Sequence, residues 1–425
     1  MKNPAVSAGG NAFQIALPIL PSTPVDRSKR DLPPFSSVPL LFLVMAKPLA
    51  DAFYEVEAVK YAYILLLAFA SLFAKSGQVF SRSPPDPRNK ELFAYIWLVS
   101  FYFAFLFGLL LAYGGTLSEI FKIVSPFAFF VLVAYAADRW LIYALAAGAA
   151  LTIVVNAGFL PFSYGWVTWG TVKTFKGYYF FKTDLAYALS FSVLIFAFYV
   201  RNSITPIFAV LMLIAAAEVI LSNSRLNYLT FLCVVVFVAA KEGMSLRSMI
   251  RYGLLFAVLG LVVALLYDPT KLLSFDTSNE AAFTQGRSVT WGRLFEALGN
   301  YSPVDWLFGR GAFADLIVSM ENTSAGQAAH NAHNEFLHML FTQGIIGSAF
   351  YAFLWLRTFR MSYSPHMPAW TRGTGAVALV LFLLQGMTAV VSSFATKTWP
   401  LVMVLLALRG LSTTGDPHKP GTSPT

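Results

Sequence analysis

The chain has 425 residues, of which 57% are hydrophobic, 16% are aromatic and only 12% are charged, and its net charge is +9. A soluble globular domain carries about 25% charged residues, so this composition excludes a soluble protein and is typical of helices that lie in lipid. The positive charge would suggest nucleic acid as the partner of a soluble chain. Here it is spread over short segments between apolar runs, which makes it an orientation signal and predicts no nucleic-acid partner. A single cysteine, Cys233, excludes an intramolecular disulfide and a cysteine-based metal site.

Apolar runs of membrane-spanning length recur along the chain and predict an all-α fold, a polytopic membrane bundle of about twelve transmembrane helices. Helices one to nine are expected within residues 36–267 and the last three within 340–410. The polar ends, 1–35 and 411–425, are expected to be disordered tails. The expected spans are 36–53, 58–74, 92–113, 119–137, 140–158, 183–200, 204–221, 226–240, 250–267, 340–357, 373–390 and 397–410. Lys47-Pro48 interrupts the first span, which favours a broken or re-entrant helix there.

The loops between these spans differ in charge from one side of the membrane to the other. Lysine and arginine are enriched in the cytoplasmic loops of membrane proteins, so the basic side and both termini are predicted to be cytoplasmic. Residues 268–339 form the one long connection and fall on the opposite, outer side, where we expect a partly helical segment that carries functional residues. The basic side holds Lys75, Arg82, Arg88, Lys90, Arg139, Arg201, Lys241, Arg247, Arg251, Arg357, Arg360, Arg372 and Arg409.

Two arginines on the outer side run against this charge rule. Arg225 opens the eighth expected span, and Arg287 follows Gly286 within the long connection. Arginine binds phosphate through two parallel hydrogen bonds and keeps its charge, so both residues are candidates for holding a phosphorylated ligand. The alternatives are an arginine that extends to the membrane interface, for Arg225, and a solvated loop arginine, for Arg287.

A basic and aromatic segment before the sixth expected span carries Lys173, Lys176 and Lys182. Lysine binds phosphate as a point charge, which makes this segment a second candidate for phosphate binding. A belt of aromatic and basic residues at the membrane interface is the alternative.

A histidine cluster follows the long connection, with His330, His333 and His338 close to Asn334 and Glu335. His330 and His333, or His333 and His338, would share a face if the segment were helical. Histidine accepts a proton near neutral pH, which favours a role as general base. A hydrogen-bonded interfacial histidine is one alternative. A zinc site is another, which the nearby arginines disfavour because they would repel a cation.

Cations and a histidine thus gather on the outer side beside lipid. Arginine can hold a diphosphate, and a neighbouring histidine can take the proton of a hydroxyl. These are the groups needed to transfer a substituent from a lipid diphosphate to an alcohol.

Two motifs give this pattern a family resemblance. Arg225 and Leu229 have the form Arg-x-x-x-Leu, and His333-Asn334 followed by Gly344 and Gly347 has the form His-Asn-x9-Gly-x2-Gly. Both are similar to signatures of the O-antigen ligase and polymerase superfamily. The resemblance covers residues from about 170 to about 350, including the glycine-rich turn 308–311 before the histidine motif.

The resemblance implies a glycosyltransferase in the bacterial inner membrane, with its site at the periplasmic face and undecaprenyl diphosphate carrying the glycan donor. Arg225 and Arg287 would hold the diphosphate, with Lys176 and Lys182 as looser matches to a basic segment of the family. His333 would activate the acceptor hydroxyl, with His330, Asn334, Glu335 and His338 as further candidates around it. The resemblance implies neither a nucleotide sugar nor a metal cofactor.

The acceptor separates two members of the superfamily. A second carrier-linked glycan would make the protein a polysaccharide polymerase, and lipid A core would make it an O-antigen ligase. We favour the polymerase, although no residue is diagnostic. The rival from another class is a transporter or flippase of lipid-linked glycans, which would place its polar groups near the bilayer midplane and often in repeated halves. Here the polar groups cluster on one side.

Overall fold

The structure is a computed structural model that describes residues 33–53, 56–79, 88–136, 140–169, 172–179, 181–199, 206–241, 287–321, 332–363, 369–387, 389–392 and 395–413. The chain divides into two units, Met1–Pro33 and Pro34–Thr425, and the architecture below is that of the second. Fourteen α-helices and one two-stranded sheet make up its described part. The predicted tails fall almost entirely outside the described residues.

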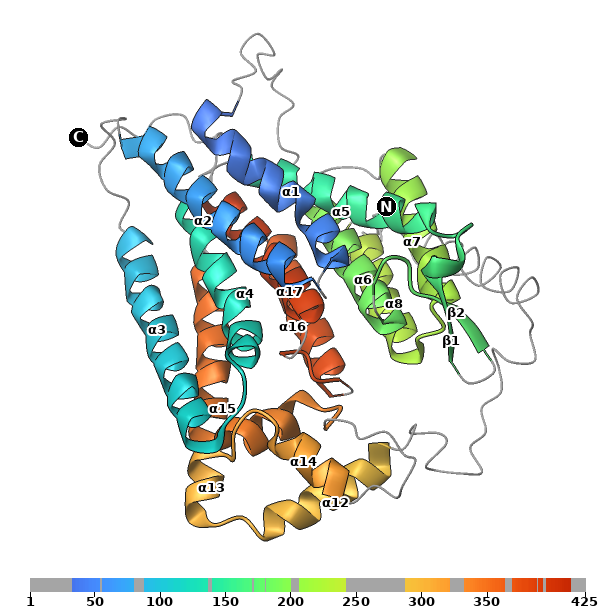
Figure 1. Ribbon diagram of the computed structural model, residues 1–425. Helices are drawn as coiled ribbons and strands as arrows, with labels where there is room; N and C mark the ends of the chain where they lie inside the picture. The colour runs from blue at the N-terminus through green and yellow to red at the C-terminus, as the bar shows by residue number, and fades with distance from the viewer. Residues whose placement is uncertain are drawn as a thin grey trace, which may run out of the picture. The chain divides into compact units, whose positions relative to one another are not determined.

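The described elements fall into three groups along the chain (Figure 1). The first group is η1 Phe35–Ser37, α1 Val38–Ala52, α2 Glu57–Val79, α3 Arg88–Tyr113, α4 Leu117–Ala136 and α5 Leu141–Gly158. The second group is η2 Ser163–Gly165, β1 Trp166–Trp169, β2 Val172–Phe175, α6 Lys182–Tyr199, α7 Pro206–Leu221 and α8 Arg225–Lys241. The third group is α12 Arg287–Gly299, α13 Pro303–Phe308, α14 Ala314–Glu321, α15 Glu335–Ser362, α16 Ala369–Gly386 and α17 Ala395–Thr413.

The predicted spans correspond to helices wherever the structure describes them. The first eight coincide with α1 to α8 and the last three with α15 to α17, whereas the ninth, 250–267, lies outside the described residues. Four of the described helices are both long and apolar enough to cross a membrane: α3 from Glu91, α4, α5 and α15. These helices are those of a membrane protein, and the count of twelve spans stays a prediction.

The break expected in the first span is wrong. α1 runs as one helix through Pro48, although proline cannot donate the hydrogen bond that Val44 would accept. α1 packs along α5, where the backbone of Gly148 lies against the carbonyl of Met45. This close packing of α1 on α5 keeps the two halves of the helix in line.

α17 lies at the centre of the bundle, in contact with α4, α5, α6, α15 and α16. Its side chains from Lys397 to Arg409 are buried, apart from the partly buried Pro400. α17 is therefore covered by other helices over this length, including its polar residues Lys397, Thr398 and Arg409.

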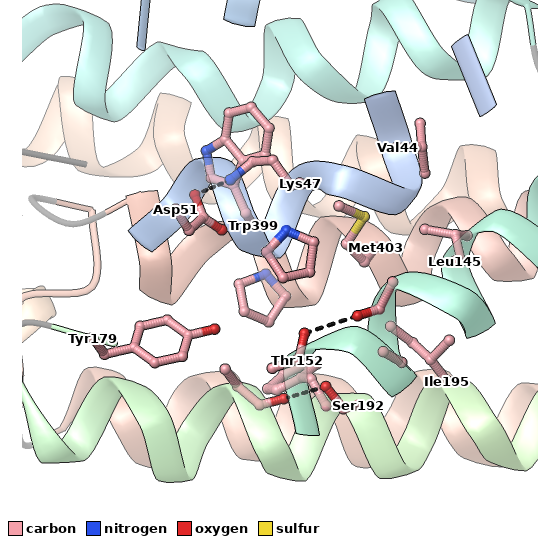
Figure 2. Close-up of a pocket in the computed structure, with 16 residues that line it drawn as sticks. Val44, Lys47, Asp51, Leu145, Thr152, Tyr179, Ser192, Ile195, Trp399 and Met403 are labelled. Atoms are coloured by element: carbon pink, nitrogen blue, oxygen red, sulfur yellow. Dashed lines mark hydrogen bonds and ion pairs between the residues drawn. The ribbon is translucent and has the colours of Figure 1, made fainter. Parts of the chain in front are cut away.

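An ion pair lies inside this bundle near the start of α17. Lys47 and Asp51, one turn apart in α1, pair with each other, and the Lys47 ammonium lies 3.6 Å from the ring centre of Trp399. The pair lines a cavity of about 40 Å³ together with Thr152 and Ser192 (Figure 2). Burying two charges is costly, and the mutual attraction of Lys47 and Asp51 together with the Trp399 ring offsets that cost.

The α12–α14 segment, residues 287–321, builds a second and smaller core against the beginning of α15 (gold and orange in Figure 1). Leu294 and Leu298 of α12 pack there with Tyr301, Leu337 and Phe341. The long connection after the ninth expected span is therefore ordered and helical over these residues, as the sequence predicted.

Candidate active site at the start of α15

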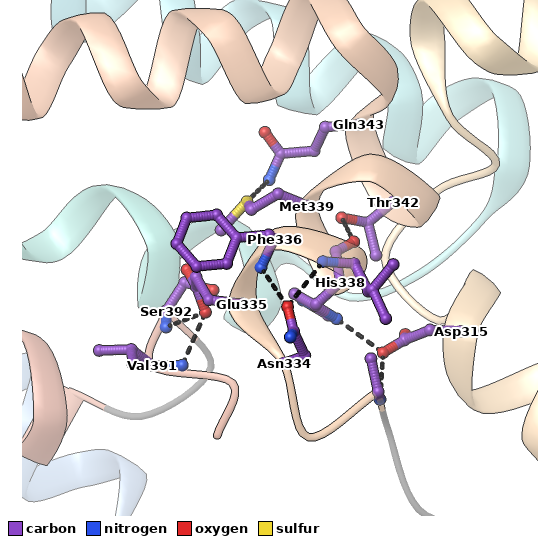
Figure 3. Close-up of polar contacts among 12 residues, drawn as sticks. Asp315, Asn334, Glu335, Phe336, His338, Met339, Thr342, Gln343, Val391 and Ser392 are labelled. Atoms are coloured by element: carbon purple, nitrogen blue, oxygen red, sulfur yellow. Dashed lines mark hydrogen bonds and ion pairs between the residues drawn. The ribbon is translucent and has the colours of Figure 1, made fainter. Parts of the chain in front are cut away.

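His333 lies two residues before α15, the longest of the described helices, which begins at Glu335. Asn334 is the N-cap of α15, and its side-chain oxygen accepts hydrogen bonds from the backbone N–H groups of Phe336 (3.0 Å) and Leu337 (3.1 Å) (Figure 3). Asparagine is among the best N-cap residues because its short side chain reaches these otherwise unpaired donors. The asparagine of the His-Asn motif therefore fixes where the helix starts, and it leaves His333 just outside.

His333 has a left-handed backbone conformation, with φ of 46°. Such a conformation costs of order 1–3 kcal/mol for a residue other than glycine, and it tends to occur at functional sites. Because His333 precedes the helix, the predicted helix face shared with His338 is wrong. His330 lies outside the described residues.

The backbone just before His333 is held by side chains from two other helices. Ala332 donates its N–H to Asp315 Oδ2 of α14 at 2.8 Å, and its carbonyl accepts a hydrogen bond from Trp291 Nε1 of α12 at 2.8 Å. Both polar groups of Ala332 are thus paired, and the strained His333 backbone lies between this fixed residue and the N-cap of α15.

Asp315 also pairs with a histidine of the cluster. His338 Nδ1 lies 2.9 Å from Asp315 Oδ2, and both side chains are buried. Burial alone would raise the pKa of Asp315, but the neighbouring His338 and the hydrogen bonds to the carboxylate hold that pKa below its ordinary value. No sequence motif contains Asp315, and its partners Ala332 and His338 are distant from it in the sequence, so the sequence alone does not identify it.

Glu335 joins the start of α15 to the connection between α16 and α17. Its Oε2 accepts hydrogen bonds from the backbone N–H groups of Val391 (2.6 Å) and Ser392 (3.0 Å) (Figure 3). Asn334 Nδ2 adds a bond to the carbonyl of Met387 at 3.3 Å. The other oxygen of Glu335 is buried and has no hydrogen-bond partner among the described residues.

The glycines of the motif have a packing role. Gly344, with φ of 65°, breaks the regular path of α15, and a Cβ there would lie 2.4 Å from the carbonyl oxygen of Leu307. Gly309, from the glycine-rich turn, packs against the same break, and a Cβ there would lie 2.4 Å from the backbone nitrogen of Gln343. The turn then donates two backbone bonds to α15, from Arg310 to Phe341 at 2.8 Å and from the next residue to Thr342. The turn therefore replaces bonds that the broken helix cannot make itself.

The two predicted arginines each begin a helix. Arg225 is the first residue of α8 and Arg287 the first of α12. α12 is tied to the His333 segment through Trp291, one turn beyond Arg287. The structure thus brings the start of the Arg287 helix and the histidine motif into one unit.

Lys182, the first residue of α6, reaches the Arg225 segment. Its ammonium donates to the carbonyl of Asn223 at 3.2 Å, and Asn227 Nδ2 donates back to the carbonyl of Thr183 at 3.1 Å. The starts of α6 and α8 are therefore joined. The N-terminal ends of helices attract anions, and these two begin with a lysine and an arginine.

Lys176 has a different environment. It follows β2, which pairs antiparallel with β1 in register Trp166↔Phe175, a hairpin that the sequence analysis did not predict. The Lys176 ammonium lies 4.2 Å from the ring centre of Tyr164, a cation–π distance. Lys182 is thus the lysine that the structure joins to the Arg225 segment.

Another cation, Lys397 of α17, was not singled out from the sequence. Its ammonium lies 3.4 Å from Asp184 Oδ1 near the start of α6, and both side chains are buried. Lys397 therefore lies close to the start of α6, and Asp184 balances its charge.

A comparison with protein families covers the part of the chain that holds this site. Residues 207–352 match the model of the O-antigen ligase family, a stretch that includes Arg225, Arg287 and the complete histidine motif. No curated protein matches the chain. Residues 207–352 therefore form a domain of the O-antigen ligase family, which confirms the resemblance to the O-antigen ligase and polymerase superfamily.

Proposed function

We propose that this protein is a membrane glycosyltransferase that moves a glycan en bloc from undecaprenyl diphosphate to an acceptor hydroxyl at the periplasmic face of the bacterial inner membrane. The O-antigen ligase domain supports a function of the ligase or polymerase type. The donor, the acceptor and the orientation in the membrane belong to the proposal.

In the proposed reaction the acceptor oxygen attacks the anomeric carbon of the donor glycan. The bond from that carbon to the diphosphate oxygen breaks, and its electron pair leaves with undecaprenyl diphosphate. His333 takes the proton of the attacking hydroxyl. Arg225 and Arg287 bind the diphosphate and stabilise the charge that grows on it, which fixed cations do best in a site without much water. Lys182 adds a further positive charge beside Arg225, and Lys176 is the weaker candidate.

The observation that carries the proposal is the way His333 is held. A strained histidine stands between two residues whose backbone or side chain is bonded to α12, α14 and the α16–α17 connection. A histidine that only filled an interface would not need such support. In this proposal the start of α15 is fixed in place by Asn334, Glu335 and His338. His330 lies outside the described residues and stays a candidate from the sequence alone.

We favour a polysaccharide polymerase, with a carrier-linked glycan as acceptor, and the ligase that uses lipid A core is the alternative. A transporter of lipid-linked glycans is the alternative from another class, and it would need no general base because it breaks no bond in the lipid-linked glycan.

The test is complementation of a strain from which the gene has been deleted. Wild type, His333→Ala, Arg225→Ala and Arg287→Ala would be compared by gel analysis of the surface glycan, with membrane levels of each protein measured. Arg360→Ala is the matched control, because Arg360 is exposed near the opposite end of α15. We expect glycan from wild type and the control only.

The form of the restored glycan distinguishes the acceptors. Long chains that remain on the carrier lipid would indicate the polymerase, and glycan joined to lipid A core the ligase. Full activity of all three site variants would overturn the proposed site and reopen the transporter.

A further inference from the structure

We propose that Asp315 is a positioning residue for this reaction, and that its carboxylate holds the backbone of the His333 segment in the strained conformation from which the imidazole meets the acceptor hydroxyl. The inference rests on the proposed function. It assigns a role to a residue of α14 that lies outside both sequence motifs.

One oxygen atom of Asp315 makes both contacts. Oδ2 accepts the N–H of Ala332 at 2.8 Å and lies 2.9 Å from Nδ1 of His338 (Figure 3). Ala332 directly precedes His333, and His338 follows it within the first turns of α15. A single atom of α14 therefore ties together the chain on both sides of His333.

The strain at His333 makes this tie necessary. A histidine with φ of 46° relaxes toward negative φ unless its neighbours are fixed. Asn334 is fixed as the N-cap of α15, and the carbonyl of Ala332 is fixed by Trp291. The Asp315 carboxylate supplies the remaining restraint, on the N–H of Ala332.

The hydrogen bond between Asp315 and Ala332 is shielded from solvent. Ala332 is fully buried and the Asp315 side chain is 1% exposed. Removing the carboxylate would leave a buried N–H without a partner, a cost that the segment can avoid only by changing conformation. Asparagine at 315 keeps an oxygen that can accept the same N–H, so Asp315→Asn separates position from charge.

The burial also decides the kind of role. Asp315 contacts the backbone N–H of Ala332 and the buried imidazole of His338, and its own side chain is only 1% exposed. It therefore acts through His333 and leaves donor binding to the arginines and Lys182. This distinction predicts that the turnover number changes while the apparent affinity for the donor does not.

The first measurement is glycan transfer by the purified full-length protein with a lipid-diphosphate-linked oligosaccharide as donor. For Asp315→Ala we expect kcat to fall roughly ten- to hundredfold, as for loss of a hydrogen bond to a charged group, with the donor KM within about twofold. Asp315→Asn should stay within about fivefold of wild type, because the amide oxygen keeps the bond. Glu296→Ala, which removes an exposed carboxylate from α12, is the control and should leave both constants unchanged.

The second measurement is hydrogen exchange by mass spectrometry on the peptide that contains Ala332 and His333. Asp315→Ala should speed exchange in this peptide, and Asp315→Asn should leave it close to wild type. Wild-type kcat in Asp315→Ala, or an Asp315→Asn protein as inactive as Asp315→Ala with normal exchange, would overturn the inference. A wild type that fails to use any lipid-diphosphate donor would overturn the proposed function instead, and the exchange rates would still report whether Asp315 holds the segment.

Discussion

At the scale of single residues, the site consists of hydrogen bonds that fix the backbone on both sides of one strained histidine, His333. The sequence motif names His333 and Asn334 because the family signature contains them. It cannot name Asp315, since the bonds from this carboxylate to Ala332 and His338 span 17 and 23 residues and exist only in the folded chain. Periodicity also misplaced His333 on a helix, because an N-cap asparagine looks like any polar residue until the helix start is known.

The strain at His333 predicts an unusual order of stabilities. Glycine adopts positive φ without steric cost, so His333→Gly should be more stable than His333→Ala by about 1 kcal/mol. Both variants lose the imidazole and should lose transfer activity. Thermal unfolding in detergent, with the gel assay on the same preparations, checks both points. A glycine variant less stable than the alanine variant would mean that the left-handed conformation is not present in the protein.

The lowered pKa of Asp305 leads to a prediction of how the stability of the folded protein changes at acidic pH. Asp305 pairs with Arg310 at 2.8 Å and forms a capping box at the start of α13 with Ser302, and these contacts lower its pKa to about 2. An unfolded aspartate has a pKa of about 3.9, so the folded carboxylate binds protons less readily. Its contribution to stability is therefore complete above the unfolded pKa and is lost as the pH falls toward the folded pKa. The stability difference between wild type and Asp305→Asn should be constant above about pH 5 and shrink between about pH 4 and pH 2. Unfolding midpoints across this range would measure it, and a difference independent of pH would contradict it.

At the scale of elements, hydropathy predicted where the helices lie but not where their backbone breaks. The expected spans match α1 to α8 and α15 to α17, because apolar length is what a membrane helix needs. The expected break at Pro48 is absent, and a break that hydropathy did not predict occurs at Gly344. Apolar length does not report backbone conformation, so a proline within a packed helix and a glycine at a docking point are invisible to it. The β1–β2 hairpin was missed for the same reason.

The joint between the glycine-rich turn and α15 makes a prediction about glycines. Gly344→Ala would place a Cβ 2.4 Å from a backbone oxygen, at positive φ, and Gly309→Ala would meet the backbone of Gln343 at the same distance. Each should destabilise the protein by about 1–3 kcal/mol and lower transfer activity, because His333 precedes the same helix. The control is Gly292→Ala within α12, where a Cβ meets nothing within 4 Å and alanine should stabilise by up to about 1 kcal/mol. Equal effects at Gly344 and Gly292 on the unfolding midpoint would rule out the tight joint.

At the scale of the whole molecule, the helices around α17 are held by apolar packing and by a few buried polar pairs. Lys47–Asp51 is one such pair, and it lies beside Trp399 of α17 (Figure 2). Composition predicted a bundle, but nothing in the sequence marked which apolar helix would be central. The central position of α17 follows from its contacts with α4, α5, α6, α15 and α16, which only the folded chain shows.

The buried pair predicts strong coupling between its two residues. Lys47→Met alone leaves a largely buried carboxylate, 14% exposed, without its partner and should cost about 2–4 kcal/mol. Asp51→Leu alone should cost a similar amount, whereas the double variant should cost clearly less than the sum, because it leaves no unpaired charge. Thermal unfolding of the four proteins in one detergent completes the cycle. Additive losses would show that the two residues do not interact in the folded protein.

The central position of α17 has a consequence for biogenesis. α17 follows every other described helix in the chain, so α4, α5, α6 and α15 leave the ribosome and enter the membrane before the helix that they surround. Until α17 is synthesised, the surfaces of these helices that contact it in the folded protein can pack only against other groups, including lipid. We therefore expect that a nonsense mutation before Ala395 leaves these helices without the helix around which they pack, and that the product is degraded rather than retained as a shortened protein.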